Sequence, residues 1–431
     1  MRLKIGFCPN LNLKFKFGQI ILLGMRPRVL EHTIRRAMRT FPAILITGPR
    51  QSGKTTLLTK RFSKTHQFVS IENPDVRARL LDDPIGFLKA HPPPVILDEI
   101  QYAPEFLHYI KTAIDENRQP GQWLLSGSQN FALMQGVSQT LSGRIAILNL
   151  LPFSLGESIG AGKQNYSIDE IISQVFSSKD HSLMSVSYTL DDWILRGSYP
   201  EIRTNPQVDR QLWCASYIQT YLERDVRQII NVGDLNTFDR FLRVCAARTG
   251  QILNLSEISR DVGMSVPTIK KWISILEASY QIYLLPPHFR NFGKRVIKSA
   301  KIYFLDPAIA SFLMGLHASE PLLNGPMIGH LFETVVISEW VKAFYHRGEK
   351  PELFYWRSKA GLEIDLLIDR NQRLFPLETK ASATLLPGHA KALNEWLNLA
   401  GEETVKGVIV ANIDNPMELS GCRVISWKHA L

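Results

Sequence analysis

The chain has few cysteines, and none are arranged to bind zinc or to build a disulfide framework. Four occur in 431 residues, at Cys8, Cys214, Cys245 and Cys422, and no two of them form a CxxC pair. Structural zinc sites and small disulfide-rich secreted domains both need paired or dense cysteines, so these two classes are excluded. We expect reduced thiols and therefore predict a cytoplasmic protein.

Long apolar runs, internal repeats and low-complexity segments are also missing. Although 45% of the residues are hydrophobic, no run of apolar residues is long enough to cross a bilayer. The sequence therefore predicts neither a membrane-spanning helix nor a membrane partner. Its length is large for one domain, so we expect two or three domains.

Acidic residues are scarce near the N-terminus. Nine basic residues and only one acidic residue lie between Met1 and Thr40, while the net charge of the whole chain is +10. Because most of the excess lies at one end, the overall charge is weak evidence for nucleic-acid binding by the rest. We interpret residues 1–24 as an extension outside the native protein or a disordered segment, and favour Met25 as the true start. A short strand remains open, and so does a signal peptide with an unusually short apolar run.

A glycine-rich segment follows a short apolar strand predicted at Ala43 to Thr47. The segment GPRQSGKT satisfies G-x-x-x-x-G-K-[ST] at every fixed position, between a predicted strand and a predicted helix. Glycines let backbone N–H groups surround phosphate oxygens, and the helix directs its positive end at the same anion. The sequence therefore predicts an ATP site with Mg²⁺, formed by Gly48, Pro49, Arg50, Gln51, Ser52, Gly53, Lys54, Thr55 and Thr56. We expect Lys54 to contact the β and γ phosphates and Thr55 to ligate the metal.

A second predicted strand, Val95 to Asp98, ends in two adjacent acids. An acid at the end of a buried strand holds Mg²⁺ in P-loop enzymes, and we assign this role to Asp98. The neighbouring Glu99 is then the candidate for polarising the attacking water. Two solvated acids at an exposed strand end are the alternative.

Two weaker candidates follow. Ser126 ends the next apolar strand, Trp123 to Ser126, and would contact the γ-phosphate or the attacking water. Arg144, in the segment LSGR, would reach a γ-phosphate of its own chain or of a neighbour, which leaves a homo-oligomer open. An ordinary strand-end hydroxyl and a surface arginine are the alternatives. Strands that alternate with helical patterns, such as Phe106 to Glu116, predict a parallel α/β sheet around this site.

The middle of the chain has the element order of a winged helix-turn-helix. A short helix from Leu255 ends at Gly263, Ser265 is a predicted N-cap, and a second helix runs from Thr268 to Tyr280 before two strand-like runs. Basic residues lie where such a fold meets DNA, namely Lys270, Lys271, Arg290, Lys294, Arg295 and Lys298. A winged helix that only packs domains together is the alternative.

The C-terminal part carries separated carboxylates in a particular order. Glu333 lies on a predicted helix, Asp365 on a strand, and Glu378 and Lys380 form an E-x-K segment on the next strand. Carboxylates in this layout hold Mg²⁺ beside a scissile phosphate, and the lysine positions or activates the attacking water. Surface charges on strands, or a related fold without cleavage, are the alternatives.

The runs GPRQSGKTT, LDEIQYAPE, SGSQNF and LSGR resemble a prokaryotic family of AAA-like P-loop ATPases with a C-terminal domain of unknown function. The resemblance starts near Met25 and includes RGSYPEIR (Arg196 to Arg203) and YIQTYLERDV (Tyr217 to Val226). It implies that Asp98 is the magnesium residue and Glu99 the water residue. The C-terminal layout resembles the restriction-endonuclease-like (PD-(D/E)xK) superfamily, and most closely its Holliday-junction-resolvase type, with Ile364 in place of the usual proline.

The sequence thus predicts an α/β protein with a parallel-sheet P-loop core, a helical and winged-helix middle, and a C-terminal restriction-endonuclease-like domain. The predicted parts are the extension 1–24, a P-loop ATPase domain 25–155, a helical linker region 156–235, a winged-helix domain 236–310 and a nuclease-like domain 311–431. We expect a Mg²⁺-dependent ATPase coupled to DNA binding and DNA cleavage. The alternative is a nucleotide-dependent switch whose C-terminal domains bind a protein partner.

Overall fold

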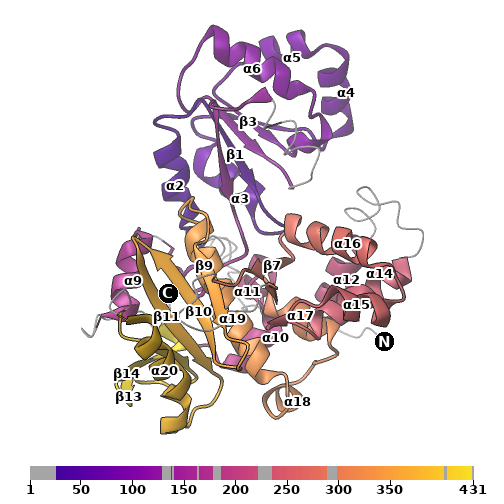
Figure 1. Cartoon of the computed structure of the whole chain (residues 1–431). Helices are drawn as coiled ribbons and strands as arrows, with labels where there is room; N and C mark the ends of the chain where they lie inside the picture. Colours follow the sequence, from indigo (N-terminus) through magenta and orange to yellow (C-terminus); the bar gives the residue numbers. More distant parts are fainter. Residues whose placement is uncertain are drawn as a thin grey trace, which may run out of the picture.

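The computed structural model describes residues 26–128, 137, 140–162, 165–177, 186–221, 235–288, 299–401 and 405–429 (Figure 1). The predicted extension 1–24 lies outside these residues, as do Arg290, Lys294, Arg295 and Lys298. Within the described part the strands form three sheets, one from each successive stretch of the chain. No helix of the described residues is long and apolar enough to cross a membrane.

The first sheet has five parallel strands in the order β2-β3-β4-β1-β5, so the parallel α/β core predicted from the sequence is confirmed. Its strands are β1 (Ala43–Thr47), β2 (Gln67–Ser70), β3 (Val95–Asp98), β4 (Trp123–Ser126) and β5 (Ile145–Asn149). Because β4 lies between β1 and β3, the carboxyl ends of these three strands are adjacent. This edge carries the P-loop, Asp98 and Ser126.

Helices cover both faces of this sheet. Successive side chains of a strand point to opposite faces, and here the side chains on both faces are apolar. Ile44 and Ile46 of β1 face one core with α2 and α3, whereas Ala43 and Leu45 face another with α4, α5 and α6. The elements around the sheet are α2 (Leu30–Ala37), α3 (Lys54–Phe62), α4 (Pro74–Asp82), α5 (Pro84–Ala90), η2 (Ile100–Tyr102) and α6 (Phe106–Glu116). The bounds predicted for α6 are those observed.

The middle of the chain is mostly helical. Its helices are α8 (Leu155–Ser158), α9 (Ile168–Phe176), α10 (Leu190–Arg196), α11 (Pro200–Thr204), α12 (Arg210–Tyr221), α14 (Leu235–Ala246), α15 (Leu255–Val262), α16 (Val266–Ala278), α17 (Pro307–Leu313) and α18 (Ser319–Leu323). A small antiparallel sheet of order β6-β8-β7 accompanies them, with β6 (Gln251–Ile252), β7 (Ile282–Leu285) and β8 (Lys301–Phe304). Ser265 caps α16 by accepting a hydrogen bond from the backbone N–H of Thr268, as predicted.

The C-terminal sheet is mixed, with six strands in the order β13-β14-β12-β11-β10-β9. Its elements are α19 (Ile328–Tyr345), β9 (Leu353–Arg357), β10 (Glu363–Arg370), β11 (Arg373–Lys380), η4 (Pro387–Ala390), α20 (Lys391–Ala400), β12 (Val408–Ala411), β13 (Met417–Leu419), β14 (Cys422–Ser426) and η6 (Trp427–His429). The strands β10 and β11, which carry Asp365 and the E-x-K segment, form an antiparallel hairpin. The helices α19 and α20 cover opposite faces of the sheet, since their residues belong to different cores.

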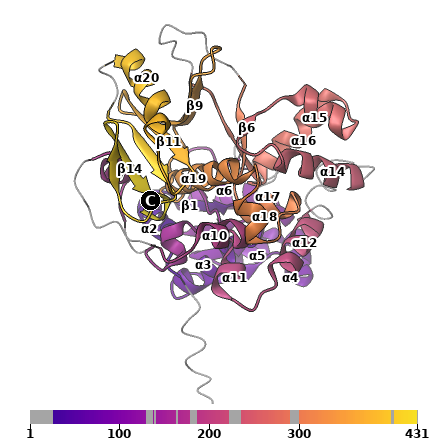
Figure 2. The same cartoon turned by 90° about the horizontal axis from the view of Figure 1, so that it is seen from below.

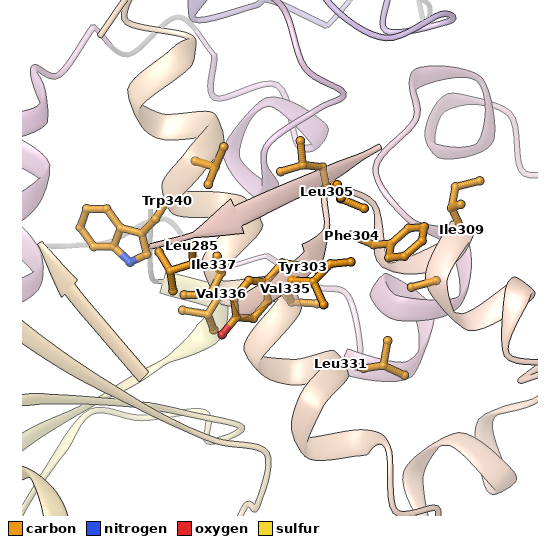
Figure 3. Packing of buried hydrophobic residues seen from close by; sticks show 14 of the residues in the cluster. Leu285, Tyr303, Phe304, Leu305, Ile309, Leu331, Val335, Val336, Ile337 and Trp340 are labelled. Atoms are coloured by element: carbon orange, nitrogen blue, oxygen red, sulfur yellow. The ribbon is translucent and has the colours of Figure 1, made fainter. Parts of the chain in front are cut away.

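One hydrophobic core joins the middle of the chain to the C-terminal sheet. It contains buried residues from Leu151 to Trp427, so it extends across the predicted boundary at residue 310. Its centre is α19, which is buried continuously from Leu331 to Phe344 and lies beside α10, α17 and α18 when viewed from below (Figure 2). Side chains of β8, including Tyr303 and Phe304, gather with α19 residues such as Val335 and Val336 (Figure 3).

Candidate functional site

The loop between β1 and α3 has the backbone that a phosphate cradle needs. Gly48 has a φ of +150°, and a Cβ there would lie 2.1 Å from the carbonyl oxygen of Leu150, so a side chain does not fit. Gly53 has a φ of +96° at the N-cap of α3. Gln51 also has a positive φ, a conformation that costs a non-glycine residue about 1–2 kcal/mol. Turns of this kind direct successive N–H groups toward one anion.

Lys54 lies inside this loop. It is the first residue of α3, and 5% of it is exposed. Its Nζ donates hydrogen bonds to the carbonyl oxygens of Gly48 and Pro49, at 3.0 and 2.9 Å. The predicted lysine therefore places a buried positive charge beside the loop's backbone.

Arg28 holds the loop in place, a role that the sequence did not indicate. Its guanidinium donates to the carbonyl oxygens of Ser52, at 2.8 Å, and Leu151, at 2.5 Å. It also forms a buried ion pair of 3.2 Å with Glu157. No pattern distinguishes Arg28 from the other basic residues near the N-terminus, because its partners are distant in the sequence.

Three predicted site residues meet at the carboxyl edge of the first sheet. The Thr55 hydroxyl donates to both carboxylate oxygens of Asp98, at 3.1 and 3.0 Å. The Ser126 hydroxyl donates to the same carboxylate. Thr55 comes from α3, Asp98 from β3 and Ser126 from β4, so sheet order brings these residues together.

The Asp98 carboxylate is buried, and its surroundings disfavour its charged form. Burial raises its pKa above the usual value for aspartate, and the charge of Glu99 acts in the same direction. Hydrogen bonds from Ser126 and Thr55 and the charge of Lys54 oppose this rise in pKa. A cation beside Asp98 would stabilise the ionised form. The carboxylate and hydroxyl oxygens here are ligands that Mg²⁺ prefers.

Glu99 follows in a left-handed backbone conformation with a φ of 59°. Non-glycine residues in this region are held there by their surroundings, often at functional sites. Its carboxylate is half-buried and accepts a hydrogen bond from the Gln101 side chain. Gln101 is a second residue of this edge that sequence reasoning missed.

Arg144 lies at the opposite edge of the sheet, which corrects one prediction. It immediately precedes β5, whose first residue, Ile145, pairs with Ala43 at the start of β1. The P-loop follows the other end of β1, so Arg144 cannot serve the phosphate site of its own chain. Its guanidinium instead forms an ion pair of 2.6 Å with Asp115. The alternative that it serves a neighbouring chain stays a prediction.

The C-terminal carboxylates lie on neighbouring elements, and each is engaged by other side chains. Asp365 accepts hydrogen bonds from the backbone N–H and the hydroxyl of Thr379, at 2.8 and 2.9 Å. Lys380 forms an ion pair of 2.8 Å with Glu378, so these two residues of β11 face the same side. A register shift between β9 and β10 lies at Ile364 to Leu367, and bulges of this kind re-aim side chains.

Glu378 is the least satisfied of these acids. It is 4% exposed, and its Oε1 atom has no hydrogen-bond partner in the described part of the chain. Burial raises its pKa to about 8, and the charge of Asp365 acts in the same direction. A buried carboxylate oxygen without a partner is costly, so a cation or a proton would stabilise it.

Glu333 reveals residues that the sequence did not single out as site residues. Its Oε1 accepts from Lys301 at 2.8 Å and from the Tyr303 hydroxyl at 2.5 Å, both on β8. Lys301 also lies 2.5 Å from Glu363 of β10. The available sequence signal is a lysine at the start of an apolar strand.

No group of three or more His, Cys, Asp or Glu side chains is placed to hold a metal ion within the described ranges. Besides burial, the charge of Asp365 raises the pKa of both Glu333 and Glu378, so the three acids interact, but they do not surround one metal position.

Lys270 and Lys271 are exposed on α16, while Ile269 and Trp272 face the core.

Family models match three successive parts of the chain. A family model described as an AAA domain matches residues 40–159, and domains of unknown function match residues 187–320 (DUF8612) and 328–430 (DUF4143). An uncharacterized protein of Mycobacterium tuberculosis is 28% identical over 353 residues, which are 81% of this chain and 73% of that protein.

Solved structures of low similarity also match. The Walker-type ATPase of Pyrococcus abyssi has 14% identity and a TM-score of 0.42, over 68% of this chain and 99% of that chain. The RuvB Holliday junction branch migration motor of Thermotoga maritima has 18% identity and a TM-score of 0.28, over 60% and 89%. ATP binding and ATPase activity are thus supported by the AAA-domain match, while the other two family models carry no assigned activity.

Proposed function

Since residues 40–159 match the AAA domain, we propose that this chain is a Mg²⁺-dependent ATPase whose ATP cycle is coupled to DNA binding and cleavage. The observation that carries the ATPase part is the meeting of Thr55, Asp98 and Ser126 beside Lys54. These groups come from three elements and share one edge of a parallel sheet, where P-loop proteins bind nucleotide.

The roles follow from the chemistry of each group. Backbone N–H groups between Gly48 and Thr56, other than at Pro49, would hold the phosphates, and Lys54 would neutralise the β and γ oxygens. Thr55 and Asp98 would hold Mg²⁺, which supplies charge at the phosphates when bound. Glu99 would accept a proton from the attacking water, and Ser126 would orient that water or the γ-phosphate.

DNA binding is proposed for the middle region. Three helices, α14, α15 and α16, and the small sheet β6-β8-β7 follow in the order of a winged helix. Lys270 and Lys271 point away from the core on α16, which would be the recognition helix. Exposed ammonium groups on such a helix attract the phosphate backbone of DNA.

DNA cleavage is proposed for the C-terminal sheet, which we interpret as restriction-endonuclease-like. Asp365 and Glu378 lie on the two strands of one hairpin, and Glu333 on the helix that covers it. With a divalent cation these acids would hold a scissile phosphate, and Lys380 would position the water. The unpartnered, buried Oε1 of Glu378 supports a cation at this position.

The helix α19 supports coupling between the two sites. Beyond Glu333 it contacts the segment that follows β5, because Glu339 accepts from the Leu155 N–H at 2.7 Å and Lys342 donates to the Phe153 carbonyl at 3.0 Å. His346, just past its end, accepts from the Leu151 N–H at 3.2 Å. The Leu151 carbonyl in turn accepts from Arg28, which holds the P-loop. A movement of the P-loop could therefore be transmitted through these hydrogen bonds and α19 to Glu333.

The alternative, a nucleotide-dependent switch that binds a protein partner, is favoured by one observation. Lys301 pairs with Glu333, and Lys380 pairs with one oxygen of Glu378. Asp365 accepts from Thr379, so each of these acids has at least one partner within the chain, as expected of a structural ion-pair cluster. Under this alternative DNA would leave ATP turnover unchanged, whereas under the leading proposal DNA raises it.

The test of the proposed function is cleavage of single-stranded, duplex and branched DNA with Mg²⁺ or Mn²⁺, with and without ATP. We expect cleavage of at least one substrate, and its loss in Asp365→Ala but not in Asp414→Ala, an acid paired with a lysine elsewhere in the same sheet domain. Intact ATP turnover without cleavage of any substrate would overturn the nuclease part and favour the switch.

A further inference from the structure

A lysine from another part of the chain lies among the C-terminal acids. Lys301 is the first residue of β8, in the middle sheet, and only 3% of it is exposed. Its Nζ lies between a carboxylate of α19 and one of β10, 2.8 Å from Glu333 and 2.5 Å from Glu363. Tyr303, two residues further along β8, binds the same oxygen of Glu333.

The Lys301 ammonium occupies the space between two of the acids at ion-pair distances. A divalent cation bound directly by these oxygens would lie about 2.0–2.6 Å from them, so it could not occupy this space together with the ammonium. The ammonium carries one charge, whereas a divalent cation carries two and can contact more oxygens. The acids further along β10 and β11 are left incompletely neutralised, as the unpartnered Oε1 of Glu378 indicates.

We propose that Lys301 is a built-in counter-cation that competes with a divalent cation for the C-terminal carboxylates, so that metal binds only when the Lys301 ammonium leaves. This inference rests on the proposed metal site of Asp365 and Glu378. The competition goes beyond that site, because it assigns the observed arrangement of Lys301 and the acids to a state that excludes metal.

The origin of Lys301 makes this competition conformational. The lysine belongs to β8, whose Tyr303 and Phe304 pack into the core formed with α19 (Figure 3). Withdrawal of the ammonium therefore requires either a new side-chain rotamer or a shift of β8 relative to α19. If β8 has to shift, metal affinity depends on how the middle sheet packs against the C-terminal region.

The test is Mn²⁺ binding by the full chain, measured by titration calorimetry with and without Asp365→Asn, because the difference isolates this site from the nucleotide site. We expect Lys301→Met to bind Mn²⁺ about tenfold more tightly or better than the unmodified chain, since removal of a nearby like charge favours a cation. Lys301→Arg keeps the charge and should resemble the unmodified chain. Lys428→Met removes an ion-paired lysine at the edge of the same domain and should change nothing.

A second measurement uses the unmodified chain and does not depend on folding of the Lys301→Met variant. Amine-reactive labelling followed by mass spectrometry should leave Lys301 protected without metal, because it is buried. Saturating Mn²⁺ should increase labelling of Lys301, and Asp365→Asn should suppress this increase.

The outcomes separate this inference from the proposed site. Equal Mn²⁺ affinity with and without Lys301, or Asp365-dependent binding that leaves Lys301 protected, would overturn the competition while leaving the metal site intact. Absence of Asp365-dependent binding in every variant would overturn both the competition and the metal site. Tighter binding after Lys301→Met together with metal-induced labelling would support the competition.

Discussion

Two buried lysines, Lys54 and Lys301, differ in what their ammonium groups contact. They are 5% and 3% exposed, respectively. Lys54 donates to backbone carbonyl oxygens of the loop that contains it. Lys301 lies between two carboxylates of distant elements.

Burial of a lysine does not by itself indicate which ligand it binds. A charge removed from water needs partners, and the charge of those partners decides what else it will attract. The carbonyl groups to which Lys54 donates are neutral, so they solvate its ammonium without cancelling its charge. The carboxylates around Lys301 neutralise it, so it competes with other cations. Removal of the two lysines should therefore have opposite effects, namely loss of an anionic ligand and gain of a cationic one.

The largest effect is expected at the P-loop. Lys54→Ala should reduce ATP binding and turnover to background, because the positive charge beside the phosphates is lost. Fluorescent-nucleotide binding and phosphate release measure both. Lys60→Ala, on the exposed side of the same helix, is the matched control and should behave normally. Near-normal turnover in Lys54→Ala would mean that the nucleotide site lies elsewhere.

Glu99→Gln tests the acid that would act on the attacking water. ATP binding should persist, while turnover should fall by about 10²–10⁴-fold, the usual contribution of a general base. Glu105→Gln, an exposed acid in the same loop region, should leave turnover unchanged. Hydrolysis that survives in Glu99→Gln would move the base to another residue.

The lysines of α16, Lys270 and Lys271, differ from both Lys54 and Lys301 because they are exposed to solvent. Reversal of Lys270 and Lys271 to glutamate should weaken DNA binding and reduce the slope of log K against log salt by up to about 2, since each lost phosphate contact contributes about 0.9. Fluorescence anisotropy at several salt concentrations gives this slope. Reversal of Lys60 and Lys64, which are exposed in the first domain, is the control. Unchanged binding would favour a packing role for this region.

The smallest effect concerns the stability contributed by His346, which accepts a hydrogen bond from the Leu151 N–H. Burial lowers the pKa of His346 from 6.5 to about 3, although the facing Glu157 opposes this and Arg28, Lys342 and Arg347 add to it. The unfolded chain therefore binds a proton at this residue more readily below pH 6.5. Stability associated with the neutral imidazole is complete above pH 6.5 and is lost as the pH falls toward 3.

His346→Gln should consequently make the melting temperature less dependent on pH below 6.5, because glutamine does not titrate. Differential scanning calorimetry over this range measures the slope. His108→Gln, an exposed histidine, is the control and should keep the slope of the unmodified chain. An unaltered slope in His346→Gln would show that other groups carry the acid sensitivity.

Much of the first sheet could be predicted because its signals are local. The strands β1, β3 and β4 and the helix α6 have the predicted bounds, since short apolar runs and helical periodicity reflect nearby residues. The motif from Gly48 to Thr55 carries its own backbone geometry. Thr55, Asp98 and Ser126 were assigned to one phosphate site from their motifs and strand ends, and the structure brings them together.

By itself, then, the sequence determined which segments form the strands and helices around the phosphate loop, because glycine spacing and apolar patterns act over a few residues. Only the tertiary structure decided the partners of the buried charges. It placed Arg144 at the far edge of the sheet, Arg28 against Leu151, 123 residues away, and Lys301 against Glu333, 32 residues away. The physical reason is that a buried charge is stabilised by whatever group folding brings near it, and no local pattern specifies that group.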